Sequence, residues 1–304
     1  MYLEFYQKQL GEIPEFLEKY LKCPSINRLK KIGYFCGMDY ASKNIYKFQE
    51  KISRYDHSLS VALMVWKLTH NKKATIAGLF HDISTPCFAH AIDYMNQDYE
   101  KQESTELFTQ DIILNDQELM KCLKEDHIFP EEVISFKDYS VVDNERPRLC
   151  ADRLDGIILT SISWTKEISF EDIEKIIDDI IIIQNEEGQD EIAFQKAKVV
   201  DRVIELNDEI DEYCHSKEDN YMMSLLGSIA KKGIEKKLFH YEDLYSMNEE
   251  EIIKLLNESS DEEIKELLEK FYHITKKEVP EIDIPNLKKR RIEPILLGKR
   301  IKKN

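Results

Sequence analysis

Glycine and proline are scarce in this sequence, which holds nine and eight of them in 304 residues. A fold of many strands needs frequent turn residues, so this scarcity argues against a large β-sheet. A helix over 3–21 should break or kink at Pro14. Periodic apolar positions predict further helices over 54–68, 74–82, 102–114, 117–124, 148–163, 170–184, 191–213 and several within 218–271. The sequence therefore predicts an all-α protein.

Long apolar runs and an excess of positive charge are also missing. No apolar stretch approaches the length of a membrane-spanning helix. The formal net charge of −16 disfavours non-specific binding to nucleic acid or to an anionic membrane, because both are polyanions. We therefore expect no membrane association and no strong nucleic-acid binding. The segment from about residue 286, NLKKRRIEPILLGKRIKKN, is basic, unlike the rest of the chain. It predicts a solvated tail or one edge strand, and its positive charge would also allow it to bind the phosphate of an effector.

Paired cysteines are a further absence. The six cysteines are widely spaced and form no Cys-x-x-Cys motif, and the first residues, MYLEFYQKQL, do not have the pattern of a signal peptide. Reduced thiols are the simplest interpretation of these cysteines. The sequence therefore predicts a cytoplasmic protein.

Histidine or aspartate residues of chemical interest lie in three of the predicted helices. His57 lies in RYDHSLSVALMVWKL, His81 and Asp82 end the next helix, and Asp152 lies in CADRLDGIIL. Imidazole nitrogen and carboxylate oxygen suit Mn, Fe, Zn, Ni or Co, and Mg less well because it prefers oxygen ligands. Such a metal lowers the pKa of bound water and neutralises phosphoryl charge. Each residue alone is explained as well by a hydrogen-bonded core histidine or a salt-bridged aspartate, and only the ordered set favours a metal site.

A second pair, His90 and Asp93, follows at once. Thr85 and Pro86 have the pattern of an N-cap followed by a first-turn proline, so the two residues would share a face of the helix that begins there. An aspartate that orients a histidine makes a candidate general acid or base. A surface contact between the two side chains is the alternative.

Arg54 lies three residues before His57 on the same side of its predicted helix. Its planar guanidinium would clamp phosphate oxygens, or it would pair with Asp56 or Glu50. Residues 22–49 are irregular and rich in aromatic side chains, and they predict a loop region on the substrate side.

Four segments carry a resemblance to a known family: INRLKKIG (26–33), SRYDHSLSVA (53–62), GLFHDISTPCFAHAID (78–93) and CADRLDGIIL (150–159). They resemble the motifs of HD-domain metal-dependent phosphohydrolases, and within them the branch of deoxynucleoside triphosphate triphosphohydrolases, although the proline of the third motif falls one place early at Pro86. The resemblance covers about the first half of the chain. It implies an all-α HD-domain helical bundle with additional C-terminal helices, often assembled as a dimer or larger oligomer.

This resemblance also implies roles for individual residues. The implied metal ligands are His57, His81, Asp82 and Asp152. The implied catalytic pair is His90 and Asp93, which would flank the scissile phosphate. The implied phosphate contacts are Arg54 and Arg153, and further candidate site residues are Arg28 and Glu100. We expect a phosphohydrolase core over 1–170 and a helical extension over 171–304 packed on it, with the basic tail from about 286.

Three positions depart from the pattern of the triphosphohydrolases. Glu100 stands where the branch often has a histidine near the phosphates, Gly156 replaces an aromatic residue that packs on the deoxyribose, and Thr160 replaces an aspartate that contacts the sugar hydroxyl. The pattern of the metal ligands is intact, whereas that of sugar recognition is not.

One main functional hypothesis and two alternatives follow. The first is a metal-dependent enzyme that hydrolyses a phosphate ester or anhydride of a nucleotide, in a reaction like that of a (deoxy)nucleoside triphosphate triphosphohydrolase, with a divalent ion (Mn, Fe, Ni, Co, Zn or Mg) as cofactor. The alternatives are a nucleotide-binding regulator with a metal site and little turnover, or a 5'-nucleotidase. In each case we expect a small phosphorylated ligand and a homo-oligomer.

Overall fold

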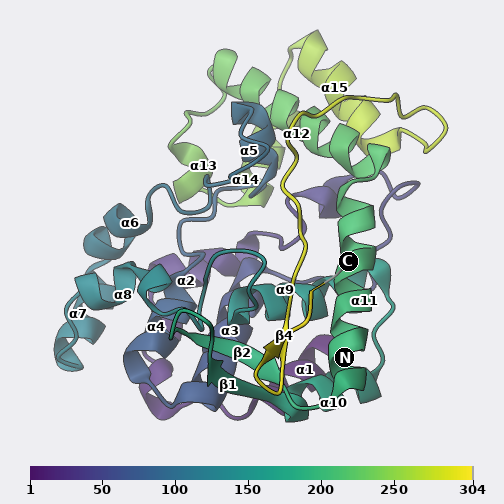
Figure 1. Ribbon diagram of the computed structural model, residues 1–304. Coiled ribbons are helices and arrows are strands. Elements are labelled where there is room, and N and C mark those ends of the chain that lie inside the picture. Colours follow the sequence, from purple (N-terminus) through teal and green to yellow (C-terminus); the bar gives the residue numbers. More distant parts are fainter. Residues whose placement is uncertain (303–304) are drawn as a thin grey trace.

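The computed structural model describes residues 1–302, and helices make up most of it (Figure 1). The helices of the first half are α1 (Tyr2–Leu10), α2 (Pro24–Arg28), α3 (Arg54–Thr69), α4 (Lys72–Phe80), α5 (Ala91–Asn96), α6 (Thr109–Asn115), α7 (Gln117–Glu125), α8 (Glu131–Ile134) and α9 (Ala151–Thr160). Those of the second half are α10 (Phe170–Asp179), α11 (Ala197–Cys214), α12 (Lys217–Glu235), α13 (Asp243–Ser246), α14 (Glu249–Asn257) and α15 (Glu262–His273). The mostly helical fold class predicted from the sequence is confirmed.

Short elements complete the chain. The 3₁₀ turns are η1 (Glu15–Leu17), η2 (Tyr20–Lys22), η3 (Leu29–Lys31), η4 (Met38–Tyr40) and η5 (Phe136–Asp138), and a π-helical turn, η6 (Ser161–Thr165), extends α9. The strands are β1 (Ile180–Gln184), β2 (Asp190–Phe194), β3 (Ile295–Leu296) and β4 (Lys299–Arg300). Residues 303 and 304 of the expected basic tail lie outside the described residues. Within residues 1–302, no helix combines the length and apolar character needed to cross a membrane.

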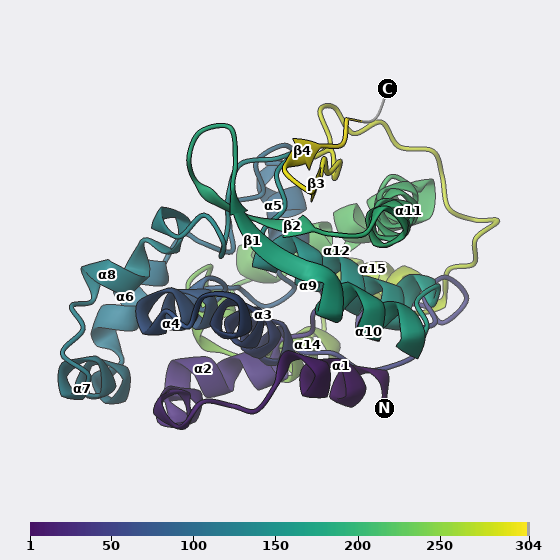
Figure 2. The same cartoon turned by 60° about the horizontal axis from the view of Figure 1, so that its bottom comes forward.

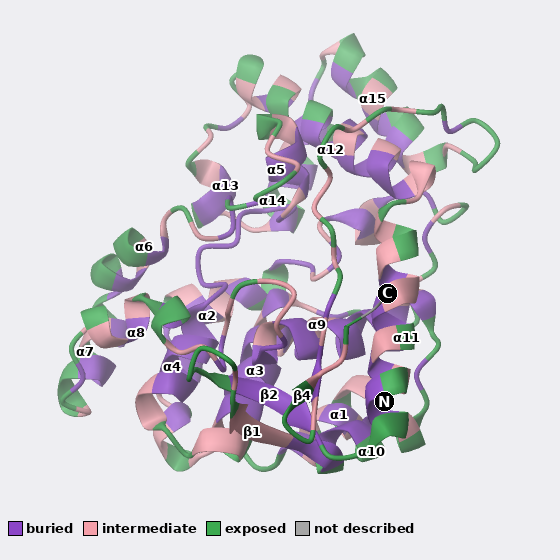
Figure 3. Ribbon diagram, in the orientation of Figure 1, coloured by how far each residue is buried: buried purple, intermediate pink, exposed green. Residues whose placement is uncertain are grey.

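Helix α3 is the centre of the lower half of the molecule in Figure 1, where it packs on α1, α4 and α9. A capping box begins it: the Ser53 hydroxyl accepts the N–H of Asp56, and the Asp56 carboxylate accepts the N–H of Ser53. Residues 57–65 of the helix are all buried, and its last turn, 66–69, reaches the surface (Figure 3). Gly78 of α4 faces α3, and a Cβ there would make ordinary van der Waals contacts of 3.5 Å with Val61 and 3.6 Å with Ala62, so the two helices are closely packed at this point. This packing holds the start of α3 near the end of α4.

A second group of helices forms the upper part of the view, where α12 packs on α5 and α15, and α15 on α14. Gly227 brings α12 against α5, since a Cβ there would lie 2.8 Å from the backbone oxygen of Ala91. Helix α11 links this group to α9 and α10 below. The expected division of the chain into residues 1–170 and 171–304 stays a prediction.

The four strands form one small sheet in the order β1-β2-β3-β4. β1 and β2 are antiparallel, with Ile180 opposite Phe194, while β3 pairs with β2 in parallel and with β4 antiparallel. Figure 2 shows the C-terminal strands beside β2 on one side of the helices. The helix predicted over 170–184 is therefore wrong at its end, where β1 forms. The helix predicted over 191–213 is wrong at its start, where β2 lies. The run IIII is β-branched and fits a strand as well as a buried helix, and the pairing of β2 with the distant C-terminal segment decides between them. The expected edge strand of the basic tail is present as β3 and β4.

The helix predicted to begin at Thr85 and Pro86 is also wrong. Helix α5 begins at Ala91, and Phe88 before it has a left-handed φ of 68°. The N–H of Phe88 donates to the carboxylate of Glu249 at 3.1 Å, so a contact with α14 replaces a bond within a helix. Tertiary packing overrides the local capping pattern here.

Candidate metal centre

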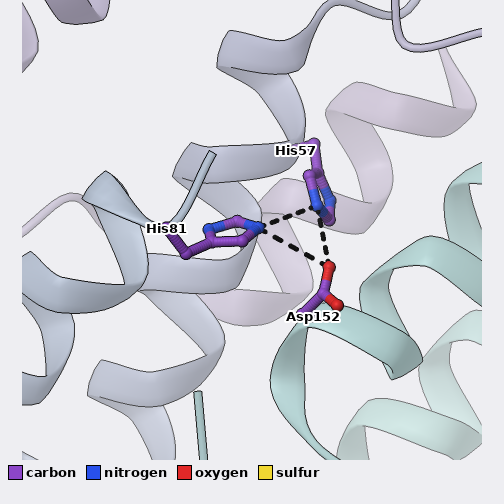
Figure 4. A group of neighbouring side chains, drawn as sticks. All are labelled: His57, His81 and Asp152. Carbon is purple, nitrogen blue, oxygen red and sulfur yellow. Dashed lines mark hydrogen bonds and ion pairs between the residues drawn. The ribbon is translucent and has the colours of Figure 1, made fainter. Parts of the chain in front are cut away.

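Three helices bring His57, His81 and Asp152 together (Figure 4). His57 lies in the first turn of α3, His81 directly follows α4, and Asp152 lies in the first turn of α9. The two Nε2 atoms are 3.1 Å apart, and Asp152 Oδ1 lies 3.1 Å from Nε2 of His57 and 3.5 Å from Nε2 of His81. Two nitrogens and one oxygen thus converge on one point, as the ligands of a divalent metal do.

The outer nitrogens of both imidazoles are fixed by hydrogen bonds. Nδ1 of His57 lies 2.6 Å from Asp155 Oδ2, and Nδ1 of His81 lies 2.7 Å from the carbonyl oxygen of Gly78. A carboxylate and a carbonyl only accept, so both Nδ1 atoms donate. In the neutral rings the two Nε2 lone pairs then face each other at 3.1 Å, an arrangement that needs a cation between them and Asp152. The donor set therefore fits a metal ion.

The pKa of His57 also indicates that positive charge is favoured between these side chains. Burial lowers the pKa of His57, but hydrogen bonds to Asp152 and Asp155 outweigh it and raise that pKa to about 10. A proton on His57 thus occupies the place that the metal would take, and metal binding would displace it.

Asp82 stands beside this group. Its Oδ2 lies 3.7 Å from Nε2 of His57 and 3.8 Å from Nε2 of His81, and it accepts a 2.7 Å salt bridge from Nη1 of Arg54. Burial raises the pKa of Asp82, but Arg54 and the two histidines hold it at about 2. The carboxylate is therefore ionised and close to the three convergent ligands, and its role as a fourth ligand stays a prediction.

Asp155 was not identified from the sequence. It is fully buried, and its other oxygen accepts a 2.5 Å hydrogen bond from the hydroxyl of Tyr6 in α1. Its place in the D-R-x-D segment, one helical turn after Asp152, was the available signal. Asp155 orients His57 and fixes its tautomer, as partners of metal-bound histidines commonly do.

The predicted pair of His90 and Asp93 is in contact. Nδ1 of His90 lies 2.8 Å from Asp93 Oδ2, and Asp93 Oδ1 accepts the N–H of Ser104 at 3.0 Å. Burial lowers the pKa of His90 and outweighs the opposing effect of Asp93. His90 is thus a neutral imidazole at the ordinary physiological pH, with Nδ1 donating to Asp93 and Nε2 left as an acceptor.

One cavity of about 750 Å³ contains His57, His81, Asp82, His90 and Asp152 in its lining. Its aromatic side chains come mainly from the region predicted as a substrate-side loop and are Tyr34, Phe35, Tyr46, Phe48, Phe136 and Trp164. Such a volume holds a molecule of nucleotide size.

Arg54 and Arg153 also line this cavity, but both are already held by carboxylates. Arg54 pairs with Asp82 at 2.7 Å, and Arg153 pairs with Asp143 at 3.0 Å and bonds to the backbone oxygens of Asn144 and Arg148. Their role as phosphate contacts stays a prediction. Asp143 belongs to a second acidic and thiol group with Cys150 that shares Asp152 with the candidate site.

The structure does not bring the other two candidates to the cavity. Arg28 donates to the backbone oxygens of Thr85, Leu244 and Met247 at 2.9–3.1 Å, so it joins α2 to the second half of the chain. Glu100 is exposed, although the neighbouring residues 101–103 contribute to the lining.

Tyr34 is a second residue that the sequence did not single out. A Cβ on Gly156 would lie 3.1 Å from the hydroxyl oxygen of Tyr34, so this ring occupies the space that the glycine leaves on α9. The ring also faces the guanidinium of Arg54 at 5.0 Å and the imidazole of His57 at 5.2 Å. An aromatic surface beside the metal ligands is therefore present, supplied by a loop.

Comparisons with known proteins give distant similarities. No protein-family model matches the chain. It is 25% identical over 253 residues to the uncharacterized protein YdhJ of Bacillus subtilis, covering 83% of this chain and 74% of that protein. It is 22% identical over 205 residues to the metal-dependent phosphohydrolase cns2 of Cordyceps militaris, covering 67% of this chain and 54%, about half, of that protein. The second similarity and the cluster of His57, His81 and Asp152 support metal-dependent phosphohydrolysis in general and a relation to the HD-domain superfamily, and they do not distinguish the triphosphohydrolase branch.

Proposed function

We propose that this protein is a metal-dependent phosphohydrolase of a nucleotide, with a reaction like that of the deoxynucleoside triphosphate triphosphohydrolases. One observation carries the proposal: His57 and His81 direct their Nε2 atoms at each other and at Asp152, while their Nδ1 atoms are committed elsewhere. The two histidines and Asp152, with Asp82 adjacent, would hold the metal. When bound, the metal supplies an activated water and neutralises charge on the phosphoryl group.

The other residues have roles that follow from their contacts. Asp93 holds His90 through Nδ1, so Nε2 of His90 is the atom that would take a proton from the attacking water and would then deliver it to the leaving oxygen. The aromatic side chains of the cavity would stack on a base or pack on a sugar. Tyr34 fills the space beside Gly156, which offers an aromatic contact where the α9 position has none.

A hydrolysis screen tests this proposal. Purified protein is incubated with dNTPs, NTPs, nucleoside monophosphates and a generic phosphodiester, each with Mn, Fe, Co, Ni, Mg and Zn, beside an Asp152→Ala variant. We expect turnover of a nucleoside triphosphate that the variant lacks, with tripolyphosphate as the product. Release of orthophosphate from monophosphates would instead identify a 5'-nucleotidase.

The screen also separates the enzyme from a regulator. Absence of turnover over the whole panel, with metal bound and a nucleotide raising the melting temperature, would contradict the enzyme and support the regulator.

The expected homo-oligomer is part of the proposal, and light scattering of the purified protein at several concentrations checks it.

A further inference from the structure

The segment between α15 and β3 crosses the molecule beside the cavity, and we call residues 286–290 the C-terminal strap (Figure 1, yellow). Hydrogen bonds fix it in the middle and at its C-terminal end. The N–H and the ammonium of Lys288 donate to the backbone oxygens of Tyr99 and Lys101 at 3.0 and 2.9 Å, and the N–H of Arg290 donates to Asp211 at 3.0 Å. The pairing of β3 with β2 follows directly. The strap is thus a built part of the structure.

Lys288 and Arg290 of the strap line the same cavity as the metal ligands, together with Arg146 from the loop before α9. Within residues 1–302, the guanidinium groups of Arg146 and Arg290 have no hydrogen bond or ion pair. The ammonium of Lys288 has only a backbone carbonyl. By contrast, four other basic side chains of the lining form ion pairs with carboxylates. These side chains are Arg54, Lys137, Arg148 and Arg153.

These three cations lie close enough to repel one another. Burial, then Arg290 and Arg146, lower the pKa of Lys288 to about 8. Burial, then Arg153 and Arg290, lower the pKa of Arg146 to about 10. Gathering positive charge in this way is unfavourable unless an anion compensates it.

Carboxylates of the lining balance this charge only in part. Burial raises the pKa of Asp219 to about 6, so it is mostly ionised at pH 7 and faces Arg290, but it accepts the hydroxyl of Tyr46 at 2.7 Å and forms no ion pair with Arg290 within residues 1–302. Glu103 and Glu145 are exposed side chains. A ligand from solution is therefore the natural partner of Arg146, Lys288 and Arg290.

We propose that Arg146, Lys288 and Arg290 bind the phosphate groups of a polyphosphorylated substrate that lie beyond the phosphate at the metal. This inference rests on the proposed function and assigns residues of this chain to the outer phosphates of its substrate. A nucleoside monophosphate needs only the metal and its nearest cation, whereas three further unpaired cations match the charge of a diphosphate or triphosphate chain. Two of them are arginines, whose planar donors suit phosphate oxygens.

Binding of inorganic tripolyphosphate, measured by isothermal titration calorimetry with a chelator present, tests the site without turnover. We expect the wild-type protein to bind tripolyphosphate well above orthophosphate. Arg146→Gln and Arg290→Gln should each weaken tripolyphosphate binding by about tenfold or more, since each removes charge-assisted hydrogen bonds. Lys289→Gln is the matched control, because Lys289 is an exposed neighbour outside the lining, and it should change binding by less than about twofold.

Several outcomes would overturn the site. They are no binding of tripolyphosphate to the wild-type protein, unchanged binding in both arginine variants, or an equal loss in Lys289→Gln. Melting temperatures separate loss of binding from loss of folding, and Arg290→Lys should recover part of the affinity.

Kinetics separate this inference from the proposed function. If a triphosphate is turned over while Arg146→Gln and Arg290→Gln leave its KM unchanged, the phosphohydrolase stands and the strap site fails. If no substrate is turned over but tripolyphosphate binding depends on both arginines, the anion site stands and the enzyme fails. Success of both requires a higher KM for triphosphates in the variants and little change for monophosphates.

Discussion

Two groups of charged residues line one cavity, and they differ in how their side chains are held. In the group at the metal centre, each imidazole has a fixed partner at Nδ1, and Asp82 is paired with Arg54. In the group at the C-terminal strap, Arg146 and Arg290 have no side-chain partner within residues 1–302. The first arrangement would orient the ligands before a metal binds, and under our proposal the second leaves donors available for a phosphate ligand. The comparison teaches that within one cavity the side chains of the candidate metal centre are held by partners from the protein, whereas those of Arg146 and Arg290 are not.

The largest expected effect is at the metal centre. His81→Ala removes one of the two convergent nitrogens and should lower both metal occupancy and turnover, the latter by about a thousandfold or more, because several kcal/mol of charge stabilisation is lost. Metal analysis of the purified protein and initial rates measure both. His273→Ala, at a histidine 68% exposed on α15, is the control and should behave like wild type. Full activity in the His81 variant would remove the metal centre from the mechanism.

A smaller loss is expected where the proton is moved. His90→Asn should lower kcat by about 100- to 10,000-fold while the protein keeps its metal, because general acid–base catalysis contributes that much. Asp93→Asn should have the same direction, since the amide no longer holds the imidazole through an ionic hydrogen bond. Loss of metal in these variants would show that the pair belongs to the metal centre and not to a separate catalytic step.

Asp155 tests how far the rigidity of the metal centre matters. Asp155→Asn should weaken metal binding by about 10- to 100-fold, as loss of an outer partner of a histidine ligand commonly does. Tyr6→Phe, which removes only the donor to Asp155, should weaken it less. Competition titrations with a chromophoric chelator measure both affinities. Equal affinity in all three proteins would mean that the orientation of His57 does not depend on Asp155.

The smallest expected effect is a pH dependence at the strap. The pKa of Lys288 is about 8, so the side chain is charged below that pH and becomes neutral above it. Tripolyphosphate binding with a chelator present should therefore weaken by about three- to tenfold from pH 7 to pH 9. In Lys288→Arg the side chain keeps its charge over this range, so the part of the pH dependence due to Lys288 should disappear. The part that remains is due to titration of tripolyphosphate itself. The charges that bear on Lys288 are those of Arg290, Arg146, Asp152 and Asp93. An identical pH profile in Lys288→Arg would contradict this role.

Much of the metal centre was predictable because its residues lie in strongly patterned helices. The apolar run after Ser53 can only be buried, and the capping box sets where α3 begins, which fixes the face on which His57 lies. His90 and Asp93 also make their predicted contact, although the helix begins later than the pattern indicates. Positions three apart face each other in a single turn as well as in a longer helix.

The failures have one physical cause, which is competition from distant parts of the chain. Glu249 takes the backbone N–H of Phe88, so the segment after Pro86 does not become helical. The isoleucine run before Gln184 is a strand because β2 pairs with it and is itself covered by β3. Glu249 and β3 lie more than 100 residues from the segments that they contact, so local pattern carries no information about them.

The sequence by itself determined the helical class, the helices that carry His57 and Asp152 or end just before His81, and the order of the motifs, because helix periodicity and capping act within a few residues. Only the tertiary structure decided that Asp155 orients His57, that Tyr34 fills the space beside Gly156, and that Arg146 and Arg290 share a cavity with the metal ligands. These contacts join segments separated by tens to hundreds of residues. The packing of the whole chain selects them, because burying the apolar faces of its helices brings those segments together.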